Sequence, residues 1–243
     1  MISKKDSKLI QQLQQKKFRV KENSFIAETP KVVEEFLRAG FILKSWYATT
    51  DYQPPSGTKV RPEEVSSKDL KSISRLESPN GTLAVFEIPK PFQTDTQNLI
   101  IALDGVRDPG NMGTIIRMAD WFNVDKVLLS EDCVDIWNPK VVQSTMGSLA
   151  RVIPEITDLP VALSELKNEG FEVRIADMDG TPSSEMDWNN PTVIVMGNEA
   201  NGPRENVCKV ADGKVTIPKL REGGAESLNV AMATGILLAQ AKL

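Results

Sequence analysis

The sequence contains no histidine among its 243 residues, and this absence restricts the chemistry open to it. Without an imidazole, Ser-His-Asp and Cys-His catalysis are excluded, as are metal sites ligated by histidine. The commonest general base near neutral pH is missing as well. Any reaction must therefore depend on a reactive cofactor, on carboxylates, or on charge and positioning.

Cysteine and long apolar runs are also scarce. Cys133 and Cys208 are far apart and outside any C-x-x-C spacing, so we expect neither a disulfide framework nor a zinc cluster, and a reducing cytoplasm is the expected location. The longest apolar run, residues 230–239, is shorter than the ~18 residues that a membrane span needs. The first 17 residues are basic and polar, which does not fit a secretory signal.

Charge is unevenly distributed along the chain, although the formal net charge is only −4. Residues 1–21 hold seven Lys and Arg against one Asp, and residues 1–80 hold fifteen against ten acids. A basic amino-terminal part on an acidic body is compatible with binding a phosphate backbone. A solvated, lysine-rich first helix is the alternative, and charge alone favours it.

Two domains are predicted, with a linker between them. Residues 89–97 (PKPFQTDTQ) combine two prolines with polar residues between two apolar strands, as a linker does. We therefore predict a domain at 1–90, a linker at 91–97 and a second domain at 98–243. In the first domain, alternating helices and strands predict a small α/β sandwich, with elements at 3–17, 24–28, 31–40, 42–48, 67–76 and 82–88.

The second domain shows sharper alternation of strands and helices. Short apolar runs predict buried strands at 98–104, 124–130, 151–156, 171–177, 192–197 and 215–218. Helical patterns lie between them, at 112–122, 141–150, 160–170 and 227–240. Strands buried on both faces and joined by helices predict a doubly wound parallel sheet. Such a sheet binds ligands beyond the carboxyl ends of its strands, which directs attention to three loops.

The first loop, LDGVRDPGNMGTIIR, follows a buried strand and leads into a helix that we expect to start near Asn111. Its glycines allow close backbone approach, and the N–H groups at the helix start can bind a polar or anionic ligand. Arg117 lies opposite the apolar stripe of this helix. The alternative for Arg117 is a surface pair with Asp120, and helix position alone favours that alternative.

The second loop, VIVMGNEANGPREN, follows another strand. Glu199 comes two residues after the strand-ending Gly197, where a carboxylate can accept hydrogen bonds from ribose hydroxyls. An ordinary turn with a solvated Glu199 is an equal alternative. Pro203 suits the first turn of a following helix.

The third loop, VTIPKLREGGAESLNV, leads into the last apolar helix. Ser227 and Asn229 can cap that helix, which is the simplest interpretation of both. Asn229 also needs a specific partner if its amide is buried. No loop matches the G-x-G-x-x-G or P-loop pattern, so an ordinary dinucleotide or NTP site is not supported.

Together the three loops resemble the motifs of the SpoU (TrmH-like) RNA ribose methyltransferases, in the SPOUT superfamily. Asn111, Gly113 and Arg117 meet the first motif, G-N-E-x-x-G at 197–202 meets the second, and I-P at 217–218 with S-L-N-V at 227–230 meets the third. The match runs in order over residues 98–243. The stretch K-L-R-E-G-G-A-E before Ser227 is longer than is usual in the family, and Ala231 stands where a Ser commonly follows Asn-Val.

The resemblance implies an α/β fold with a parallel sheet and a carboxyl-terminal trefoil knot. The amino-terminal part resembles the ribosomal-protein-like RNA-binding domain, a small α/β sandwich, that precedes many members of the family. The resemblance to the SpoU family further implies a homodimer through the carboxyl-terminal domain, S-adenosylmethionine as cofactor and RNA as partner. Ribosomal RNA is slightly favoured over transfer RNA. We expect neither a metal nor a membrane partner.

The resemblance also implies the site residues. Around the methyl group and the incoming ribose it places a catalytic set of Asn111, Arg117, Glu199, Ser227 and Asn229. Around the cofactor it places Thr145, Met146, Gly147, Met196, Gly197, Gly202, Ile217 and Leu228.

The expected reaction is methylation of a ribose 2′-hydroxyl, which suits a site without histidine because the cofactor carries the activated methyl. Arg117 is often cast in this family as the base. A guanidinium does not readily lose its proton, so our hypothesis is that Arg117 fixes the adjacent phosphate and stabilises developing alkoxide charge, with Asn111 orienting it. A non-catalytic RNA-binding protein with the same fold is the alternative, and an unrelated nucleotide-binding oxidoreductase is a second.

Overall fold

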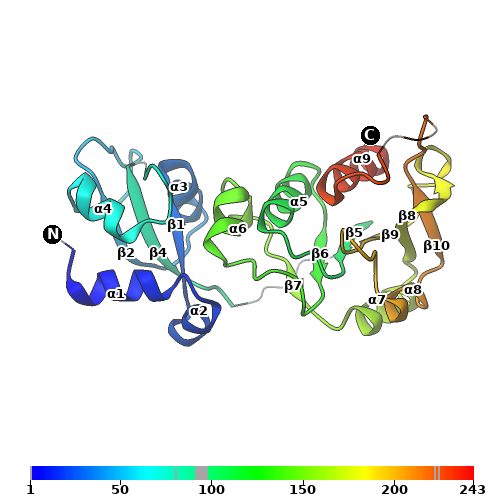
Figure 1. The fold of residues 1–243 in the computed structure, drawn as a ribbon, viewed down its shortest axis with the longest axis horizontal. Helices are drawn as coiled ribbons and strands as arrows, with labels where there is room; N and C mark the ends of the chain where they lie inside the picture. The colour runs from blue at the N-terminus through cyan, green and yellow to red at the C-terminus, as the bar shows by residue number, and fades with distance from the viewer. Residues whose placement is uncertain (1, 80, 91–97, 222, 224) are drawn as a thin grey trace. The chain divides into compact units, whose positions relative to one another are not determined.

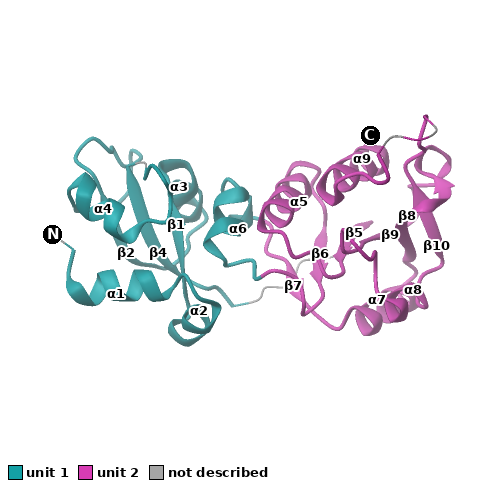
Figure 2. Ribbon diagram, viewed as in Figure 1, with its two compact units in different colours: residues 1–90, 135–151 teal, residues 91–134, 152–243 magenta. Residues whose placement is uncertain are grey.

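The computed structural model describes residues 2–79, 81–90, 98–221, 223 and 225–243, and they form two compact units (Figure 1; Figure 2). Unit 1 comprises residues 1–90 and 135–151, and unit 2 comprises residues 91–134 and 152–243. The predicted linker at 91–97 lies outside the described residues. Segment 135–151, which we had assigned to the second domain from sequence, groups with unit 1 by its contacts.

Unit 1 is built on a four-stranded sheet in the order β1-β4-β2-β3. β4 pairs antiparallel with both β1 and β2, and the short β3 pairs parallel with β2. The strands are β1 (Ser24–Glu28), β2 (Leu43–Ala48), β3 (Glu63–Glu64) and β4 (Thr82–Glu87). The helices are α1 (Lys4–Gln12), α2 (Lys16–Glu22), α3 (Pro30–Arg38), α4 (Ser67–Ile73) and, from segment 135–151, α6 (Pro139–Ser144).

The single helix predicted at 3–17 was wrong, because the chain breaks into α1 and α2. Ser3 caps α1 by accepting a hydrogen bond from the backbone N–H of Asp6, and Gln15 is extended between the two helices. The break leaves Leu13 in the core and turns Arg19 of α2 inwards. The predicted helix at 141–150 was also too long, since α6 ends at Ser144 and a separate 3-10 turn covers Ser148–Ala150.

Segment 135–151 contributes to the core of unit 1. Trp137 lies with its ring centroid 4.5 Å from that of Phe25, within a cluster of aromatic rings that also includes Phe36, Phe41 and Phe86. A second apolar cluster contains Ile10, Ile26, Tyr47, Leu70 and Val85, among others. Ile26 and Phe25 are neighbours on β1 and point to opposite faces, so both faces of the sheet are covered.

A buried ion pair ties segment 135–151 to α2. Arg19 is 2% exposed; its Nε donates to Asp135 Oδ2 at 2.9 Å and its Nη1 to the backbone oxygen of Leu13 at 2.8 Å. Nη2 lies 2.5 Å from the same Asp135 oxygen. The carboxylate is mostly buried too, so each charge is satisfied mainly by the other.

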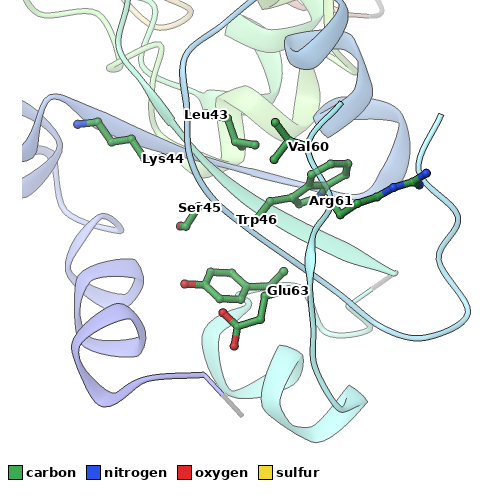
Figure 3. A pocket seen from close by; sticks show the side chains of 8 residues that line it. Leu43, Lys44, Ser45, Trp46, Val60, Arg61 and Glu63 are labelled. Carbon is green, nitrogen blue, oxygen red and sulfur yellow. The ribbon is translucent and has the colours of Figure 1, made fainter. Parts of the chain in front are cut away.

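Unit 1 also has a recess of about 270 Å³ between β2 and the segment that leads into β3 (Figure 3). Trp46 and Arg61 line it, but Trp46 is almost wholly buried and donates its indole N–H to Thr82. The ammonium group of Lys44 donates hydrogen bonds to the backbone oxygens of Glu22 and Asn23. The recess therefore exposes little aromatic surface for stacking.

Unit 2 is built on a six-stranded sheet in the order β10-β8-β9-β5-β6-β7, and every neighbouring pair is parallel. The strands are β5 (Leu99–Leu103), β6 (Lys126–Leu129), β7 (Glu155–Ile156), β8 (Glu172–Pro182), β9 (Thr192–Met196) and β10 (Gly213–Thr216). The predicted parallel sheet is confirmed. β7 is shorter than predicted and β8 is longer.

Helices cover both faces of this sheet, as Figure 1 shows. α5 (Pro109–Trp121) packs against α9 (Val230–Lys242) on one face. α7 (Leu159–Asn168) and α8 (Glu205–Cys208) lie on the other, over a core that includes Ile100, Ala102, Val173, Val193 and Val195. The alternate residues Ile101 and Ile194 are buried as well, as expected of strands covered on both sides.

Among the described residues, no helix combines the length and the apolar character that crossing a membrane requires.

Replacing Arg19 with Ala should lower the free energy of unfolding by about 3 kcal/mol, because it leaves the Asp135 carboxylate buried without its cation. Urea unfolding followed by tryptophan fluorescence measures this. Lys21→Ala is the matched control on the same helix; its exposed side chain should contribute less than about 0.5 kcal/mol. Equal, small effects in both variants would show that the Arg19–Asp135 pair does not hold segment 135–151.

Candidate active site

The candidate site lies where the chain leaves neighbouring strands of unit 2 in opposite directions. β5 and β9 are adjacent and parallel; from β5 the chain continues towards β6, whereas β9 leads across β8 to β10. At such a switch point the two following loops diverge and leave space for a ligand. The loops after β5 and β9 are the first two loops that the sequence singled out.

The loop after β5 begins α5 with a well-formed cap. Asp108 Oδ1 accepts a hydrogen bond from the backbone N–H of Asn111 at 2.8 Å, and Pro109 occupies the first turn. The helix therefore starts two residues before the predicted Asn111. Gly105 has φ +72°, and a Cβ there would lie 3.2 Å from a carboxylate oxygen of Asp132. The loop after β6 thus approaches this backbone closely.

Asn111 connects all three predicted loops. Its Nδ2 donates to Glu199 Oε1 at 2.8 Å, and its Oδ1 accepts from Asn229 Nδ2 at 2.9 Å. These partners lie 88 and 118 residues away along the chain. The structure therefore brings together Asn111, Glu199 and Asn229, three of the five predicted catalytic residues.

Asn229 also caps α9. Its Oδ1 accepts the backbone N–H of Ala231 at 2.9 Å and that of Met232 at 3.3 Å, so the capping role expected of it is confirmed. The Asn229 side chain is exposed, and both atoms of its amide are hydrogen-bonded: Nδ2 to Asn111, and Oδ1 to the start of α9. Ser227 is exposed and lies two residues before this cap, so α9 begins later than predicted. Ala231 is buried, and there a methyl group suits the packing.

The loop after β9 folds into a tight turn that presents Glu199. Asn198 and Gly202 form an isolated antiparallel bridge, and Asn198 Oδ1 accepts the backbone N–H of Ala200 at 3.0 Å. A Cβ at Gly197 would lie 2.2 Å from the backbone nitrogen of Pro203. Only glycine allows the chain to double back at this point.

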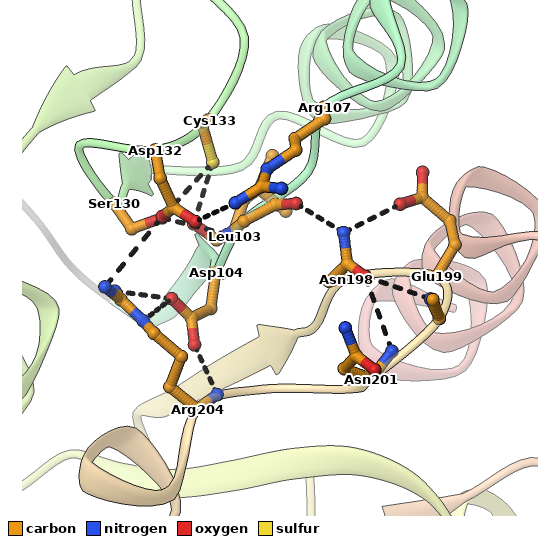
Figure 4. Close-up of polar contacts among 12 residues, drawn as sticks. Leu103, Asp104, Arg107, Ser130, Asp132, Cys133, Asn198, Glu199, Asn201 and Arg204 are labelled. Atoms are coloured by element: carbon orange, nitrogen blue, oxygen red, sulfur yellow. Dashed lines mark hydrogen bonds and ion pairs between the residues drawn. The ribbon is translucent and has the colours of Figure 1, made fainter.

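Sequence reasoning missed an ion pair between Asp104 and Arg204. Asp104 is the first residue after β5 and is 1% exposed. Its Oδ2 accepts the backbone N–H of Arg204 at 2.6 Å, and its Oδ1 accepts Arg204 Nε at 2.8 Å (Figure 4). The hydrogen bond that Arg204 donates to Asp104 raises the pKa of Arg204 above its ordinary value. The only sequence signal was a carboxylate directly after a buried strand.

Sequence reasoning also missed a set of polar contacts that joins the loop after β6 to the loops after β5 and β9. Ser130 Oγ accepts the backbone N–H of Gly105 at 2.9 Å and donates to Asp132 at 2.7 Å. Arg107 donates to the same carboxylate at 3.0 Å (Figure 4). The Ser130 bond, helped by Arg107 and Arg204, lowers the pKa of Asp132 below its usual value. Asp132 is therefore charged at neutral pH.

The remaining predicted residues are distributed as follows. Arg117 is exposed on α5, six residues beyond Asn111, which is about 9 Å along the helix axis. Met196 is buried at the end of β9, Ile217 follows β10, and Leu228 is half exposed before α9. Thr145, Met146 and Gly147 belong to unit 1, where Gly147 lies against the Glu35 side chain. The catalytic role of Arg117 and the cofactor role of the other residues stay predictions.

The exposed groups at the switch point suit a polar organic ligand. Glu199 offers carboxylate oxygens to hydroxyl or cationic groups, and Asn111, whose amide is bonded to Glu199 and to Asn229, holds this carboxylate. Gly202 has open space where a Cβ would be, so a ligand can approach this backbone closely. Within the described part of the chain, no group of three or more Cys, Asp or Glu side chains could hold a metal ion.

Comparison with known proteins agrees with this geometry. Residues 98–239 match the SpoU rRNA Methylase family, and residues 5–84 match the MRM3-like substrate binding domain. The chain belongs to the SpoU rRNA methylase family.

Among its relatives, the 23S rRNA (guanosine(2553)-2′-O)-methyltransferase of Bacillus subtilis is 32% identical, over 93% of this chain and 91% of the relative. An RNA methyltransferase of the TrmH family from Porphyromonas gingivalis has the same fold, with a TM-score of 0.86 and 34% identity over 100% of this chain and 98% of its own. The AdoMet-bound rRNA methyltransferase from Sinorhizobium meliloti gives a TM-score of 0.85 and 29% identity, over 99% and 95%.

Replacing Gly197 with Ala should destabilise unit 2 by about 2 kcal/mol, because the added methyl group meets backbone rather than a movable side chain. Hydrogen exchange at the amides of Ala200 and Gly202 should accelerate with it. Gly170→Ala is the control in the same unit: Gly170 has φ +96°, unlike Gly197, but nothing lies near the new Cβ. It should cost about 1 kcal/mol and leave those amides unchanged. Unaltered exchange in Gly197→Ala would contradict the packing argument.

Proposed function

We propose that this protein transfers a methyl group from S-adenosylmethionine to a ribose 2′-hydroxyl of ribosomal RNA. The observation that carries the proposal is the convergence of Asn111, Glu199 and Asn229 at the carboxyl ends of β5 and β9. Membership of the SpoU rRNA methylase family and the named rRNA relative support both the reaction and the choice of RNA.

The residues at the switch point fit the cofactor by their chemistry. When bound, S-adenosylmethionine supplies a methyl group activated on a positively charged sulfur. Backbone groups of Met196, Gly197, Gly202, Ile217 and Leu228 would hold its adenosine and methionine parts. For Thr145, Met146 and Gly147, which belong to unit 1, the cofactor role stays a prediction. The Glu199 carboxylate supplies negative charge at the same place.

The chain itself has to hold the ribose oxygen in line with the methyl group and manage one proton. Asn111 and Asn229 hold the Glu199 carboxylate in one orientation. Ser227 lies beside this set on the chain, and its hydroxyl can donate to or accept from the ribose. Arg117 fixes the phosphate next to the target ribose and stabilises the charge that develops on its oxygen. Because a guanidinium keeps its proton, the 2′-hydroxyl proton leaves late, to phosphate or water.

The fold of the family suggests two further features of unit 2. We propose that its carboxyl-terminal part is threaded as a trefoil knot, and that the protein is a homodimer through unit 2. Supporting a dimer, Trp121 on α5 is 85% exposed and Met232 on α9 is 62% exposed, and these two helices pack against each other. A cytoplasmic location stays a prediction.

We propose that unit 1 binds the substrate RNA through its basic helices. Lys4 and Lys8 lie one turn apart on α1, and both are exposed. The match of residues 5–84 to a substrate binding domain supports this role. The rival function, an RNA-binding protein without turnover, predicts the same RNA affinity but no methyl transfer.

Arg117→Lys should lower kcat for methyl transfer about 100-fold, because an ammonium cannot reproduce the bidentate contacts of a guanidinium. Tritiated-methyl incorporation into ribosomal RNA, with cofactor affinity from calorimetry, measures this. Cofactor affinity should stay within about twofold of wild type if Arg117 acts on the RNA side. Transfer at the wild-type rate in Arg117→Lys would exclude the positioning role. An inactive wild type that still binds RNA would favour the rival function.

The double variant Lys4→Gln with Lys8→Gln should reduce the slope of log Kd for RNA against log salt by about 2, because two phosphate contacts are lost. The control replaces Lys126 and Lys209 with Gln. Both of these ammonium groups already lie within 2.8 Å of a carboxylate, so they have little to offer a phosphate. The same slope change in both variants would mean that overall charge, rather than α1, determines binding.

A further inference from the structure

The loop that presents Glu199 is anchored at both ends to two residues. At its start, the backbone N–H of Asp104 donates to the oxygen of Met196 at 2.9 Å, and Asn198 Nδ2 donates to the oxygen of Gly105 at 2.9 Å. At its end, Arg204 binds the Asp104 carboxylate. Glu199 therefore lies in a short loop whose two ends are both bonded to the first two residues after β5, Asp104 and Gly105. Figure 4 shows Asn198 and Glu199 at one end of this loop and the Asp104–Arg204 pair at the other.

The anchor at the end of the loop is the contact between Arg204 and Asp104, which combines an ion pair with a backbone hydrogen bond. Both oxygens of Asp104 are used: Oδ2 by the Arg204 backbone N–H, and Oδ1 by Nε, with Nη2 also 2.6 Å from Oδ1. Because the carboxylate is 1% exposed, its charge has to be compensated by these contacts. Arg204 is consequently held by its backbone and by its side chain at once.

This anchor matters for Glu199 because the backbone of the loop decides whether its carboxylate reaches the two side chains that hold it, Asn111 and, at 3.5 Å, Asn198. Glu199 is exposed, and a free glutamate has several rotamers of similar energy. Its bond to Asn111 requires the backbone of the loop to place the carboxylate within reach at 2.8 Å. The Asn198–Gly202 bridge makes the tip of the loop stiff, so a shift at Arg204 moves Glu199 with it.

We infer that Arg204 is a positioning residue for methyl transfer: paired with the buried Asp104, it holds the loop so that the Glu199 carboxylate meets Asn111. This inference rests on the proposed function for its consequence in catalysis, whereas the anchoring itself does not. A direct contact between Arg204 and an RNA phosphate is the competing explanation, since the Arg204 side chain is 48% exposed.

The test is a double-mutant cycle with Arg204→Ala and Glu199→Gln, in which kcat for methyl transfer to ribosomal RNA is measured. Arg204→Ala keeps the backbone N–H and removes the guanidinium. It should lower kcat about 10- to 100-fold in the wild-type background, and less than about threefold once Glu199 is Gln, because residues that act as a unit are not additive. Its RNA KM and the salt dependence of RNA binding should not change. Additive losses, or a reduced salt slope, would overturn the inference.

Two further variants separate positioning from general destabilisation. Arg204→Lys keeps the positive charge and should recover part of kcat, though not the geometry of the Nε contact. Lys209→Ala removes an exposed ion pair with Glu205; Lys209 caps the other end of the short helix α8 that Arg204 precedes, and its loss should leave kcat unchanged. Equal losses in Arg204→Ala and Lys209→Ala would assign the effect to the stability of α8 and overturn the inference.

Hydrogen exchange of the loop tests the anchor without using activity. The amides of Ala200 and Asn201 both donate to Asn198 Oδ1, and they should exchange faster in Arg204→Ala but not in Lys209→Ala. If the wild type transfers no methyl group, the proposed function fails while this exchange experiment still decides the anchoring. If exchange is unchanged in Arg204→Ala, Arg204 does not hold the loop, whatever the activity.

Discussion

Parallel pairing of β5 with β9 is the constraint on which the candidate site depends. Because the two strands run side by side in the same direction, the residues that follow them, Asp104 and Gly197, emerge together at one edge of the sheet. The chain then leaves β5 and β9 in opposite directions, so the loops diverge instead of packing closed. The polar groups of both loops are thereby brought together without burying them all.

Charge and geometry, rather than acid–base chemistry, dominate this site. With no histidine available, the polar side chains of the loops are carboxylates, guanidinium groups and neutral amides. Asp132, with its lowered pKa, and Asp104, paired with Arg204, make the framework. Glu199 remains exposed, and Asn111, which bonds to it, is half-buried. Such a division suits a reaction whose cofactor brings the activated group and whose protein supplies alignment.

The boundaries of the two units differ from those of the family matches. The SpoU match runs through residues 98–239, yet segment 135–151 packs with the amino-terminal residues through Trp137 and the Arg19–Asp135 pair. Residues 1–90 alone would expose the face of the unit 1 sheet on which Trp137 packs against Phe25. The part of the chain that matches the MRM3-like substrate binding domain is therefore completed by a segment from within the SpoU match.

Much of this architecture could be predicted from the sequence, because it follows from local patterns. Short apolar runs determine buried parallel strands, and the Pro-Gly and Gly-Asn-Glu turns after them mark the loops. The resemblance to known motifs was enough to group Asn111, Glu199 and Asn229. Only the tertiary structure decided that Asp104 pairs with Arg204, one hundred residues away, and that Asp135 pairs with Arg19. No local pattern identifies the partner in either pair, because an ion pair depends on distance in space and on burial, which only the tertiary structure sets.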